Sequence, residues 1–369
     1  MTRTLFPLRI RVIRGSVTPS ADSYRQLSGT GSLTAISDGY ARPSLRCSWK
    51  RGFYCECMTS AGVVARDIRR PRWLSPLRYP GGKGRFATYL GDLVSQQLGR
   101  MDVEVFLEPF AGGAGAGLAL LDEGTIESLW LVEKNPALAA FWRVLCSDGN
   151  NLAYTVENTQ PSMRLWHESR EIVAARERGE HVDDMLLGYA AFVLNRCSRS
   201  GIPASNVGPI GGKNQTGRWT IASRFNPSEL GGRVRRIAAL ASRIEVWEDD
   251  AVSRIAGLSD SGVEDEVFIF ADPPYVVDGP KLYRHSFTTA DHVALSMVLA
   301  ACPARWVLTY DAHPLVADTL YRGFRILEYT IAHSAHRTHV DREYAVFSDT
   351  TCVDRDAVPL PGGSARWLA

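Results

Sequence analysis

The stretch Val267-Phe268-Ile269-Phe270-Ala271, followed directly by Asp272-Pro273-Pro274-Tyr275, is the most informative part of this sequence. Five consecutive apolar residues predict a buried strand, and the two prolines must end it. Asp272 is therefore expected at the carboxyl end of a strand, the edge at which open α/β sheets bind ligands. The Asp272 carboxylate and the Pro273 carbonyl are acceptors in a stiff turn, and Tyr275 offers an aromatic face. This set suits a planar ring that carries an amino group, although a turn with a capping acid has the same composition.

The overall composition is that of an ordinary soluble enzyme. A chain of 369 residues has room for a large core and two lobes, and its hydrophobic share of 45% and charged share of 22% are typical of globular proteins. No apolar stretch is long enough to span a bilayer, so no membrane partner is expected. The seven cysteines are scattered and odd in number, which argues against a disulfide scaffold and favours a reducing, cytoplasmic setting.

Residues 1–74 differ in composition from the rest of the chain. Lys and Arg greatly outnumber Asp and Glu there, Ser and Gly are frequent, and neither helical nor alternating periodicity stands out. We predict a basic, disordered N-terminal extension without catalytic residues. Two alternatives stay open, namely translated sequence upstream of a start at Met58 and a targeting segment.

Beyond residue 75 the pattern predicts a doubly wound α/β sheet. Apolar runs at 103–107 and 129–132 predict two strands joined by a glycine-rich loop and a helix, and Pro136 opens a further helix. The strand pattern returns after a long polar interval. The later strands are predicted at 244–247, 267–271, 306–309, 326–329 and 343–347, with a helix near 291–301.

The polar interval predicts a lobe inserted into the sheet domain. It has helical periodicity over 162–195 and is rich in Gly, Pro and Asn over 200–232. The chain therefore leaves the sheet and returns to it. The predicted parts are a catalytic sheet domain in two pieces (75–148 and 236–352), an inserted lobe (149–235) and a tail (353–369).

A glycine-rich loop lies between the first predicted strand and helix, within Phe106-Leu107-Glu108-Pro109-Phe110-Ala111-Gly112-Gly113-Ala114-Gly115. Glycines let the backbone approach a ligand closely, and no Lys-Ser or Lys-Thr follows to make a P-loop. Glu133 ends the next strand about twenty residues later, where an acid commonly binds both hydroxyls of a ribose. A solvated strand end is the alternative for Glu133. Together, the loop and the acid favour an adenosine-containing cofactor, either NAD or S-adenosylmethionine.

Two features favour S-adenosylmethionine over NAD. A hydride-transfer enzyme has no need of the amine-accepting turn at 272–275. The first predicted strand is also preceded by Leu77-Arg78-Tyr79-Pro80-Gly81-Gly82-Lys83, in which an aromatic residue and a lysine flank two glycines. Such a segment suits covering a nucleoside and neutralising a carboxylate, although alone it would predict only a turn.

Five motifs occur along the chain in a fixed order. They are Tyr79-Pro80-Gly81-Gly82-Lys83, then Glu108-Pro109-Phe110-Ala111-Gly112-Gly113-Ala114-Gly115, Glu133-Lys134-Asn135-Pro136, Asn195-Arg196 with Ser200-Gly201, and Asp272-Pro273-Pro274-Tyr275. In these motifs the chain resembles the Dam-type (D12 class) N6-adenine-specific DNA methyltransferases over roughly residues 75–350. The resemblance implies an α/β fold, a seven-stranded S-adenosylmethionine-dependent methyltransferase (Rossmann-like) sheet with an inserted target-recognition lobe.

The resemblance also implies roles for particular residues. The cofactor-binding set is Tyr79, Lys83, Glu108, Phe110, Gly112, Gly113, Glu133, Asn135, Asp250 and Asp272. Asp250 would lie near the adenine of the cofactor, with Asp249 as the neighbouring alternative. The catalytic set is the DPPY motif Asp272, Pro273, Pro274 and Tyr275, and no metal is expected. The chain departs from the family in two places: Glu133 replaces the common Asp, and Arg199-Ser200-Gly201-Ile202 replaces an Asn-Gly-Leu-Tyr stretch. The second departure bears on the DNA sequence recognised rather than on the chemistry.

The implied reaction is methyl transfer to the N6 amino group of adenine in duplex DNA, with base flipping. Hydrogen bonds from that amino group to the Asp272 carboxylate and the Pro273 carbonyl would localise the nitrogen lone pair and stabilise the charge that develops in the transition state. Tyr275 would stack on the flipped base.

Residues 193–243 are strongly basic, and Asn, Gln, Ser and Trp219 are interleaved with the charges. This composition predicts phosphate contacts and reading of base edges, with an exposed basic face as the alternative. The DNA-binding candidates are Arg196, Arg199, Lys213, Arg218 and Arg224. His333, His336 and His339 predict a polar loop near DNA rather than a metal site.

Two alternative functions stay open. One is an amino-methyltransferase that acts on ribosomal RNA, and the other is a DNA-binding regulator that has lost catalysis. The Tyr79–Lys83 motif and the basic lobe favour DNA over RNA, and the intact turn at 272–275 favours an active enzyme. The expected partners are double-stranded DNA and, in a restriction-modification setting, a cognate restriction endonuclease. A monomer or weak dimer in a bacterial or phage-infected cytoplasm is expected.

Overall fold

The computed structural model describes residues 74–79, 83–97, 103–199, 201, 207–258, 262–263, 265–277, 287–333, 339–354, 356 and 363–368. The predicted N-terminal extension at 1–74, except its last residue, lies outside these ranges. So do Pro80, Gly81 and Gly82 of the first motif.

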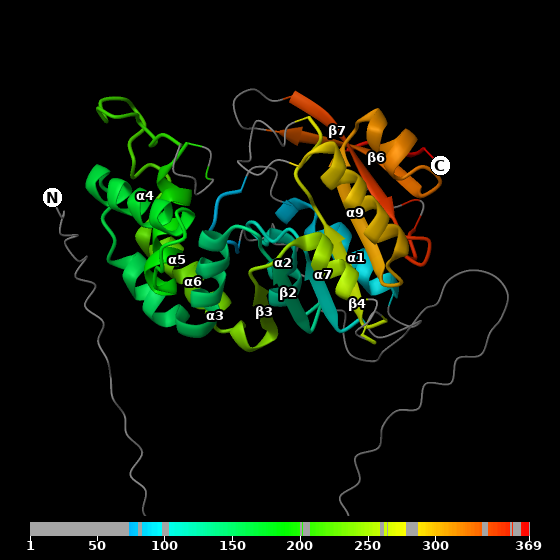
Figure 1. The fold of residues 1–369 in the computed structure, drawn as a ribbon, viewed down its shortest axis with the longest axis horizontal. Coiled ribbons are helices and arrows are strands. Elements are labelled where there is room, and N and C mark those ends of the chain that lie inside the picture. Colours follow the sequence, from blue (N-terminus) through cyan, green and yellow to red (C-terminus); the bar gives the residue numbers. More distant parts are fainter. Residues whose placement is uncertain are drawn as a thin grey trace, which may run out of the picture. The chain divides into compact units, whose positions relative to one another are not determined.

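The described residues form one mixed sheet of eight strands (Figure 1). The strands are β1 (Val105–Glu108), β2 (Ser128–Val132), β3 (Ile244–Trp247), β4 (Val267–Ala271), β5 (Arg305–Asp311), β6 (Arg325–His333), β7 (His339–Phe347) and β8 (Ala365–Trp367). Their order is β3-β2-β1-β4-β5-β7-β6-β8. The first five are parallel, whereas β7, β6 and β8 each run antiparallel to the strand before them in this order. The α/β class is thus confirmed, and the strands predicted at 244–247 and 267–271 match β3 and β4 in full.

The expected count of seven strands is wrong, because the described residues form eight. The additional strand β8 lies in the segment assigned as a tail and pairs antiparallel with β6, with Leu327 opposite Trp367. Trp367 packs against Phe347, with 5.6 Å between the ring centres. A strand of three residues carries too little periodicity to be recognised in a sequence.

Helices cover both faces of the parallel part of the sheet. They are α1 (Ala87–Gln97), α2 (Gly115–Glu123), α3 (Pro136–Glu157), α7 (Ala251–Leu258) and α9 (Thr289–Ala301), with a π-helix at Leu315–Leu320 and 3₁₀ turns at Lys83–Arg85 and Ala241–Arg243. Phe268 and Phe270 of β4 pack in the apolar core that contains α1, α2 and α3. Ile269, which points to the other face, packs in the core formed with α7 and α9. Burial on both faces explains why β4 is an unbroken apolar run.

Three further helices pack beside α3, as the green part of Figure 1 shows. They are α4 (Met163–Glu177), α5 (Asp184–Cys197) and α6 (Pro227–Ala238). Phe192 of α5 stacks on Phe141 of α3 with 5.6 Å between the ring centres. These helices share one apolar core with α1 and α2. The helical part of the predicted lobe is therefore built onto the sheet domain by apolar packing.

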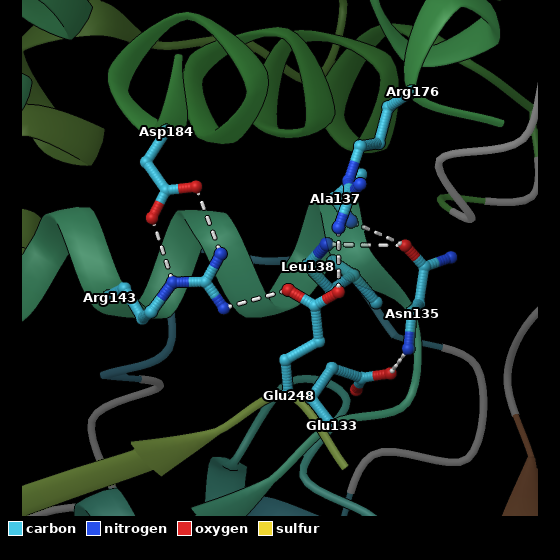
Figure 2. Close-up of polar contacts among 8 residues, drawn as sticks. All are labelled: Glu133, Asn135, Ala137, Leu138, Arg143, Arg176, Asp184 and Glu248. Carbon is cyan, nitrogen blue, oxygen red and sulfur yellow. Dashed lines mark hydrogen bonds and ion pairs between the residues drawn. The ribbon is translucent and has the colours of Figure 1, made fainter. Parts of the chain in front are cut away.

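Ion pairs connect these helices to the end of β3 (Figure 2). Arg143 of α3 makes a two-pronged pair with Asp184 at the start of α5, with N–O distances of 2.8 and 2.9 Å. Glu248, which follows β3, pairs with Arg143 at 2.9 Å and with Arg176 of α4 at 3.0 Å. Such partly exposed pairs contribute about 0–1 kcal/mol each. They orient the helices, and the apolar packing supplies most of the stability.

Within the described ranges, no helix combines the length and the apolar character needed to cross a membrane.

Replacing Gly188 by Ala should destabilise the fold. A Cβ at this position in α5 would lie 2.8 Å from Cα of Phe141, so the backbones of α3 and α5 would have to separate. We expect the free energy of unfolding in urea to fall by about 1–3 kcal/mol, as is common for overpacked cores. Gly257→Ala in α7 is the matched control, because apart from the chain around Gly257 in its own helix no atom lies within 4 Å of the added Cβ. Equal stability of the two variants would contradict the close approach of the helices.

Candidate active site

The candidate site lies at the carboxyl ends of three neighbouring parallel strands. β1 pairs with β2 on one side and with β4 on the other, so Glu108, Glu133 and Asp272 follow or end adjacent strands. The chain changes direction along the sheet between β1 and β4. Open α/β sheets bind their ligands at such a switch point.

Lys83, which is buried, forms an ion pair with the partly exposed Asp272 at this edge. The Lys83 Nζ atom lies 2.9 Å from Oδ1 and 3.2 Å from Oδ2 of Asp272. Thr309 of β5 donates a hydrogen bond to Oδ1 of Asp272 at 2.7 Å. Burial alone would lower the pKa of Lys83, but the carboxylates of Asp272 and Glu343 outweigh that effect and raise it. The amine therefore stays charged inside the protein, and the Asp272 carboxylate is held by two other elements.

Tyr275, the last residue of the catalytic turn, is anchored by its hydroxyl group. Lys83 donates a hydrogen bond to this hydroxyl at 2.6 Å, and the same ammonium lies 4.9 Å from the centre of the Tyr275 ring. Burial and the neighbouring carboxylates raise the pKa of Tyr275 well above its ordinary value. The tyrosine is thus a neutral, fixed aromatic group beside Asp272.

Two acids that the sequence did not single out support the turn. Asp311, at the end of β5, accepts hydrogen bonds from the backbone N–H groups of Val276 at 3.0 Å and Val277 at 2.9 Å. Glu343 of β7 is buried, 3.8 Å from the Lys83 Nζ atom. The signal for Asp311 was the same as for Asp272, an acid directly after an apolar strand.

The glycine loop is held by Glu133 and covered by Tyr79. The backbone N–H of Gly112 donates to the Glu133 carboxylate at 3.0 Å, and Trp142 donates its indole N–H to the Gly112 carbonyl at 3.1 Å. Gly112 has a φ of +46°, and a Cβ on it would lie 2.8 Å from the Tyr79 ring. The structure therefore brings four predicted cofactor residues together, namely Tyr79, Gly112, Gly113 and Glu133.

Asn135 is placed differently from Glu133, as Figure 2 shows. Its side-chain oxygen accepts hydrogen bonds from Ala137 and Leu138 and so caps α3, while its backbone N–H donates to Glu133 at 2.8 Å. Asn135 thus orients the acid. Burial raises the pKa of Glu133 to about 7.

Glu108 lies behind the glycine loop and is almost fully buried. Its carboxyl group accepts a hydrogen bond from the backbone N–H of Gly117 in the first turn of α2. Burial raises the pKa of Glu108 to about 8, and the nearby charge of Asp272 adds to the effect. Glu108 therefore fixes the start of the helix that follows the loop.

The remaining cofactor candidates lie at the rim of this arrangement. Asp250 accepts hydrogen bonds from the N–H groups of Val252 and Ser253 at the start of α7, and it pairs with Lys134 at 2.8 Å. Phe110 packs edge-to-face on Phe287, with 5.6 Å between the ring centres. Of the other predicted catalytic residues, Pro273 is buried and Pro274 is half-buried.

The Arg196 side chain donates hydrogen bonds to backbone carbonyls of the protein itself. Its guanidinium donates to the carbonyls of Arg224 at 2.8 Å and Pro76 at 3.3 Å. Burial and the neighbouring cation of Arg78 lower its pKa to about 10. This geometry does not support the prediction that Arg196 contacts DNA, because these hydrogen bonds hold its side chain against two backbone segments.

Two of the other DNA-binding candidates lie beside an exposed aromatic ring. Trp219 is 56% exposed, and the guanidinium groups of Arg218 and Arg224 lie 5.3 and 5.8 Å from its ring centre. Lys213 and Arg199 are exposed in the same loop region, where Arg199 also donates to the Pro209 carbonyl at 3.3 Å. The remaining basic residues of this segment are paired with acids or carbonyls elsewhere in the fold: Arg233, Arg235, Arg236 and Arg243.

Of the three spaced histidines, His336 lies outside the described residues. His333 and His339 stand opposite each other where β6 and β7 pair.

Replacing Glu108 by Gln should make the stability less dependent on pH. The folded state raises the pKa of Glu108 from 4.5 to about 8, so its contribution to stability is complete below pH 4.5 and is lost as the pH rises through about 8. Gln stays neutral and can still accept the Gly117 N–H. The free energy of unfolding in urea should fall less between about pH 5 and about pH 9 for the variant than for the wild type. Glu104→Gln, at an exposed position, is the control and should keep the pH dependence of the wild type. If the free energy of unfolding of Glu108→Gln changed with pH as that of the wild type does, the effect assigned to the burial of Glu108 would be contradicted.

Comparison with known proteins identifies the family. The family described as "D12 class N6 adenine-specific DNA methyltransferase" has a sequence model that matches residues 79–332, well over half of the chain. No curated protein matched the sequence. Two solved structures of the rRNA methyltransferase aviRa from Streptomyces viridochromogenes are weakly similar. The structure at 2.4 Å is 15% identical, with 74% of this chain and 88% of that chain covered and a TM-score of 0.32. The structure at 1.5 Å is 15% identical, with 76% of this chain and 93% of that chain covered and a TM-score of 0.34. The chain belongs to the D12 class N6 adenine-specific DNA methyltransferases, enzymes that transfer a methyl group from S-adenosylmethionine to adenine in DNA.

Proposed function

We propose that this methyltransferase modifies adenine within specific sequences of duplex DNA and that the target base rotates out of the helix to reach Asp272. The position of Asp272 carries the proposal. It follows β4 at the switch point of the sheet, and its side chain remains 25% exposed while Lys83 and Thr309 hold it. A base stacked inside a duplex cannot reach an acceptor fixed at the edge of a sheet, so it must leave the stack.

The residues around the glycine loop suit S-adenosylmethionine. Glu133 is buried at the end of β2, and two backbone N–H groups orient its carboxylate, which is the acceptor we assign to the ribose hydroxyls. Tyr79 lies over Gly112 and Gly113, as expected of a side chain that covers a nucleoside. When bound, S-adenosylmethionine supplies a methyl group on a sulfonium that is its own leaving group.

Asp272 and Pro273 act on the amino group of adenine. The lone pair of that nitrogen is delocalised into the ring, which makes it a poor nucleophile. Hydrogen bonds to Oδ2 of Asp272 and to the Pro273 carbonyl would localise the lone pair and stabilise positive charge on the nitrogen. We assign Oδ2 because its contact with Lys83, at 3.2 Å, is the longer one, whereas Oδ1 accepts from Thr309 at 2.7 Å and lies 2.9 Å from Lys83.

Tyr275 holds the flipped base by stacking. Its hydroxyl is anchored by Lys83, and the N–H groups of the next two residues are anchored by Asp311. A ring fixed at both ends loses little conformational entropy when a base stacks on it.

The loop that carries Trp219 is the proposed DNA surface. Gln215 braces it, since its side-chain amide donates to the carbonyls of Ile210 and Gly212 and accepts from the N–H of Ile221 at 2.7 Å. Arg199, Lys213, Arg218 and Arg224 supply positive charge around it. Cations that contact phosphates, together with an exposed aromatic ring, fit a nucleic-acid surface whose affinity depends on salt.

Asp272→Ala should abolish methylation and leave DNA binding largely intact, because the carboxylate acts on the amino group and not on the phosphates. Tritiated methyl transfer to duplex DNA, followed by digestion to nucleosides, measures the first effect, and filter binding measures the second. Asp265→Ala is the control, since Asp265 is an exposed acid before the same strand. Full activity of Asp272→Ala would remove this residue from the mechanism, and methylation of ribosomal RNA but not DNA by the wild type would contradict the proposed substrate.

Replacing both Arg218 and Arg224 by Ala should weaken binding to duplex DNA about equally for different sequences. The slope of log affinity against log salt should fall by about one for each phosphate that the variant no longer binds. Arg322→Ala, an exposed cation next to the π-helix, is the control and should keep the wild-type slope. An unchanged slope in the double variant would exclude this loop as the DNA surface.

A further inference from the structure

A buried carboxylate, that of Glu343, lies beside Lys83, within 4 Å of the ammonium. Glu343 of β7 is 2% exposed, and its Oε2 atom lies 3.8 Å from the Lys83 Nζ atom. Tyr329 donates a hydrogen bond to the same oxygen at 2.6 Å, and burial together with the charge of Glu343 raises the pKa of Tyr275. Glu343 therefore lies beside the cation that holds Asp272 and acts electrostatically on the tyrosine that ends the turn.

The fold does not need Glu343 to neutralise Lys83. Asp272 already contacts the ammonium with both oxygens, at 2.9 and 3.2 Å. Removing a further carboxylate from water carries a large desolvation cost, which is seldom repaid in stability. With one cation and two carboxylates, these three residues carry a net negative charge inside the protein. Uncompensated charge of this kind is typical of functional sites.

The proposed chemistry gives this extra charge a use. The adenine amino nitrogen becomes positive as it accepts the methyl group, and a nearby negative charge stabilises that change. Asp272 alone would act poorly as an anion, because Lys83 at 2.9 Å forms a nearly neutral pair with it. A second fixed carboxylate beside Lys83 offsets the ammonium, and in a poorly solvated site its field is only weakly screened.

We propose that Glu343 is a positioning residue for methyl transfer, whose negative charge balances Lys83 so that Asp272 acts on the adenine amino group as an anion. The proposal rests on the proposed function of Asp272.

The test compares single-turnover rates of adenine methylation at saturating S-adenosylmethionine and duplex DNA. Glu343→Gln keeps the size of the side chain and an acceptor oxygen for Tyr329, and removes only the charge. We expect the rate to fall about tenfold or more, because preorganised charge acts on the transition state, with the dissociation constants of cofactor and DNA nearly unchanged. Glu343→Asp keeps the negative charge on a shorter side chain, so it should be faster than Glu343→Gln.

Two controls separate charge from structure. Tyr329→Phe removes a hydrogen bond to Glu343 without changing its charge and should stay close to the wild-type rate. Glu328→Gln neutralises a second buried carboxylate that pairs with Arg366 at 2.8 Å, away from Lys83, and should also leave the rate unchanged.

The outcomes are distinguishable. A Glu343→Gln variant as fast as the wild type, a Tyr329→Phe or Glu328→Gln variant as slow as Glu343→Gln, or a Glu343→Asp variant slower than Glu343→Gln would each overturn the role of Glu343. Wild-type enzyme that leaves duplex DNA unmethylated would instead contradict the proposed function. If Glu343→Gln does not fold, Glu343→Asp decides: a rate within about tenfold of the wild type supports the charge balance, and a lower rate overturns it.

Discussion

The ion pair between Lys83 and Asp272 is the contact on which the arrangement of the site depends. Lys83 comes from the 3₁₀ turn before α1, and Asp272 follows β4, so the pair joins the first motif of the chain to the last. A partly buried pair of this kind adds little net stability, because the cost of desolvating the charges offsets most of their attraction. Its effect is geometric. It fixes the carboxylate toward the open edge of the sheet and, through the Tyr275 hydroxyl, fixes the aromatic ring beside it.

The segment that precedes Lys83 is supported by a side chain that imitates a peptide group. Asn195 of α5 accepts a hydrogen bond from the Arg78 N–H and donates one to the Arg78 carbonyl, both at 2.7 Å. Arg196, the next residue, bonds to the carbonyl of Pro76. The same helix leads into the loop that carries Trp219. Helix α5 therefore supports both the segment with Tyr79 and the basic loop, and a shift of α5 would move both of them.

Several parts of the fold and site could be predicted because they depend on local sequence. β2 is apolar after Ser128 and β4 is apolar throughout, and the acids that follow these two strands could be placed from the apolar runs alone. Glu343 and Asp311 could not be given a role, since their partners come from distant segments that only the pairing of strands brings near. Arg196 shows a different limit. A cation in a basic segment can bond to carbonyls of its own fold as well as to phosphates, and composition does not distinguish the two.

The place of β7 in the sheet has a consequence for how this enzyme becomes active. β7 lies between β5 and β6 although it follows both in the sequence. During synthesis β5 is therefore an unpaired edge until residues 339–347 have emerged, and such an edge readily pairs with other chains. Long-range pairing of this type is also slow, because a large loop must close first. Since Glu343 lies on β7, a nascent or truncated chain would combine an open strand edge with a site that lacks its second carboxylate, and catalytic competence would arise only when the last gap in the sheet is filled.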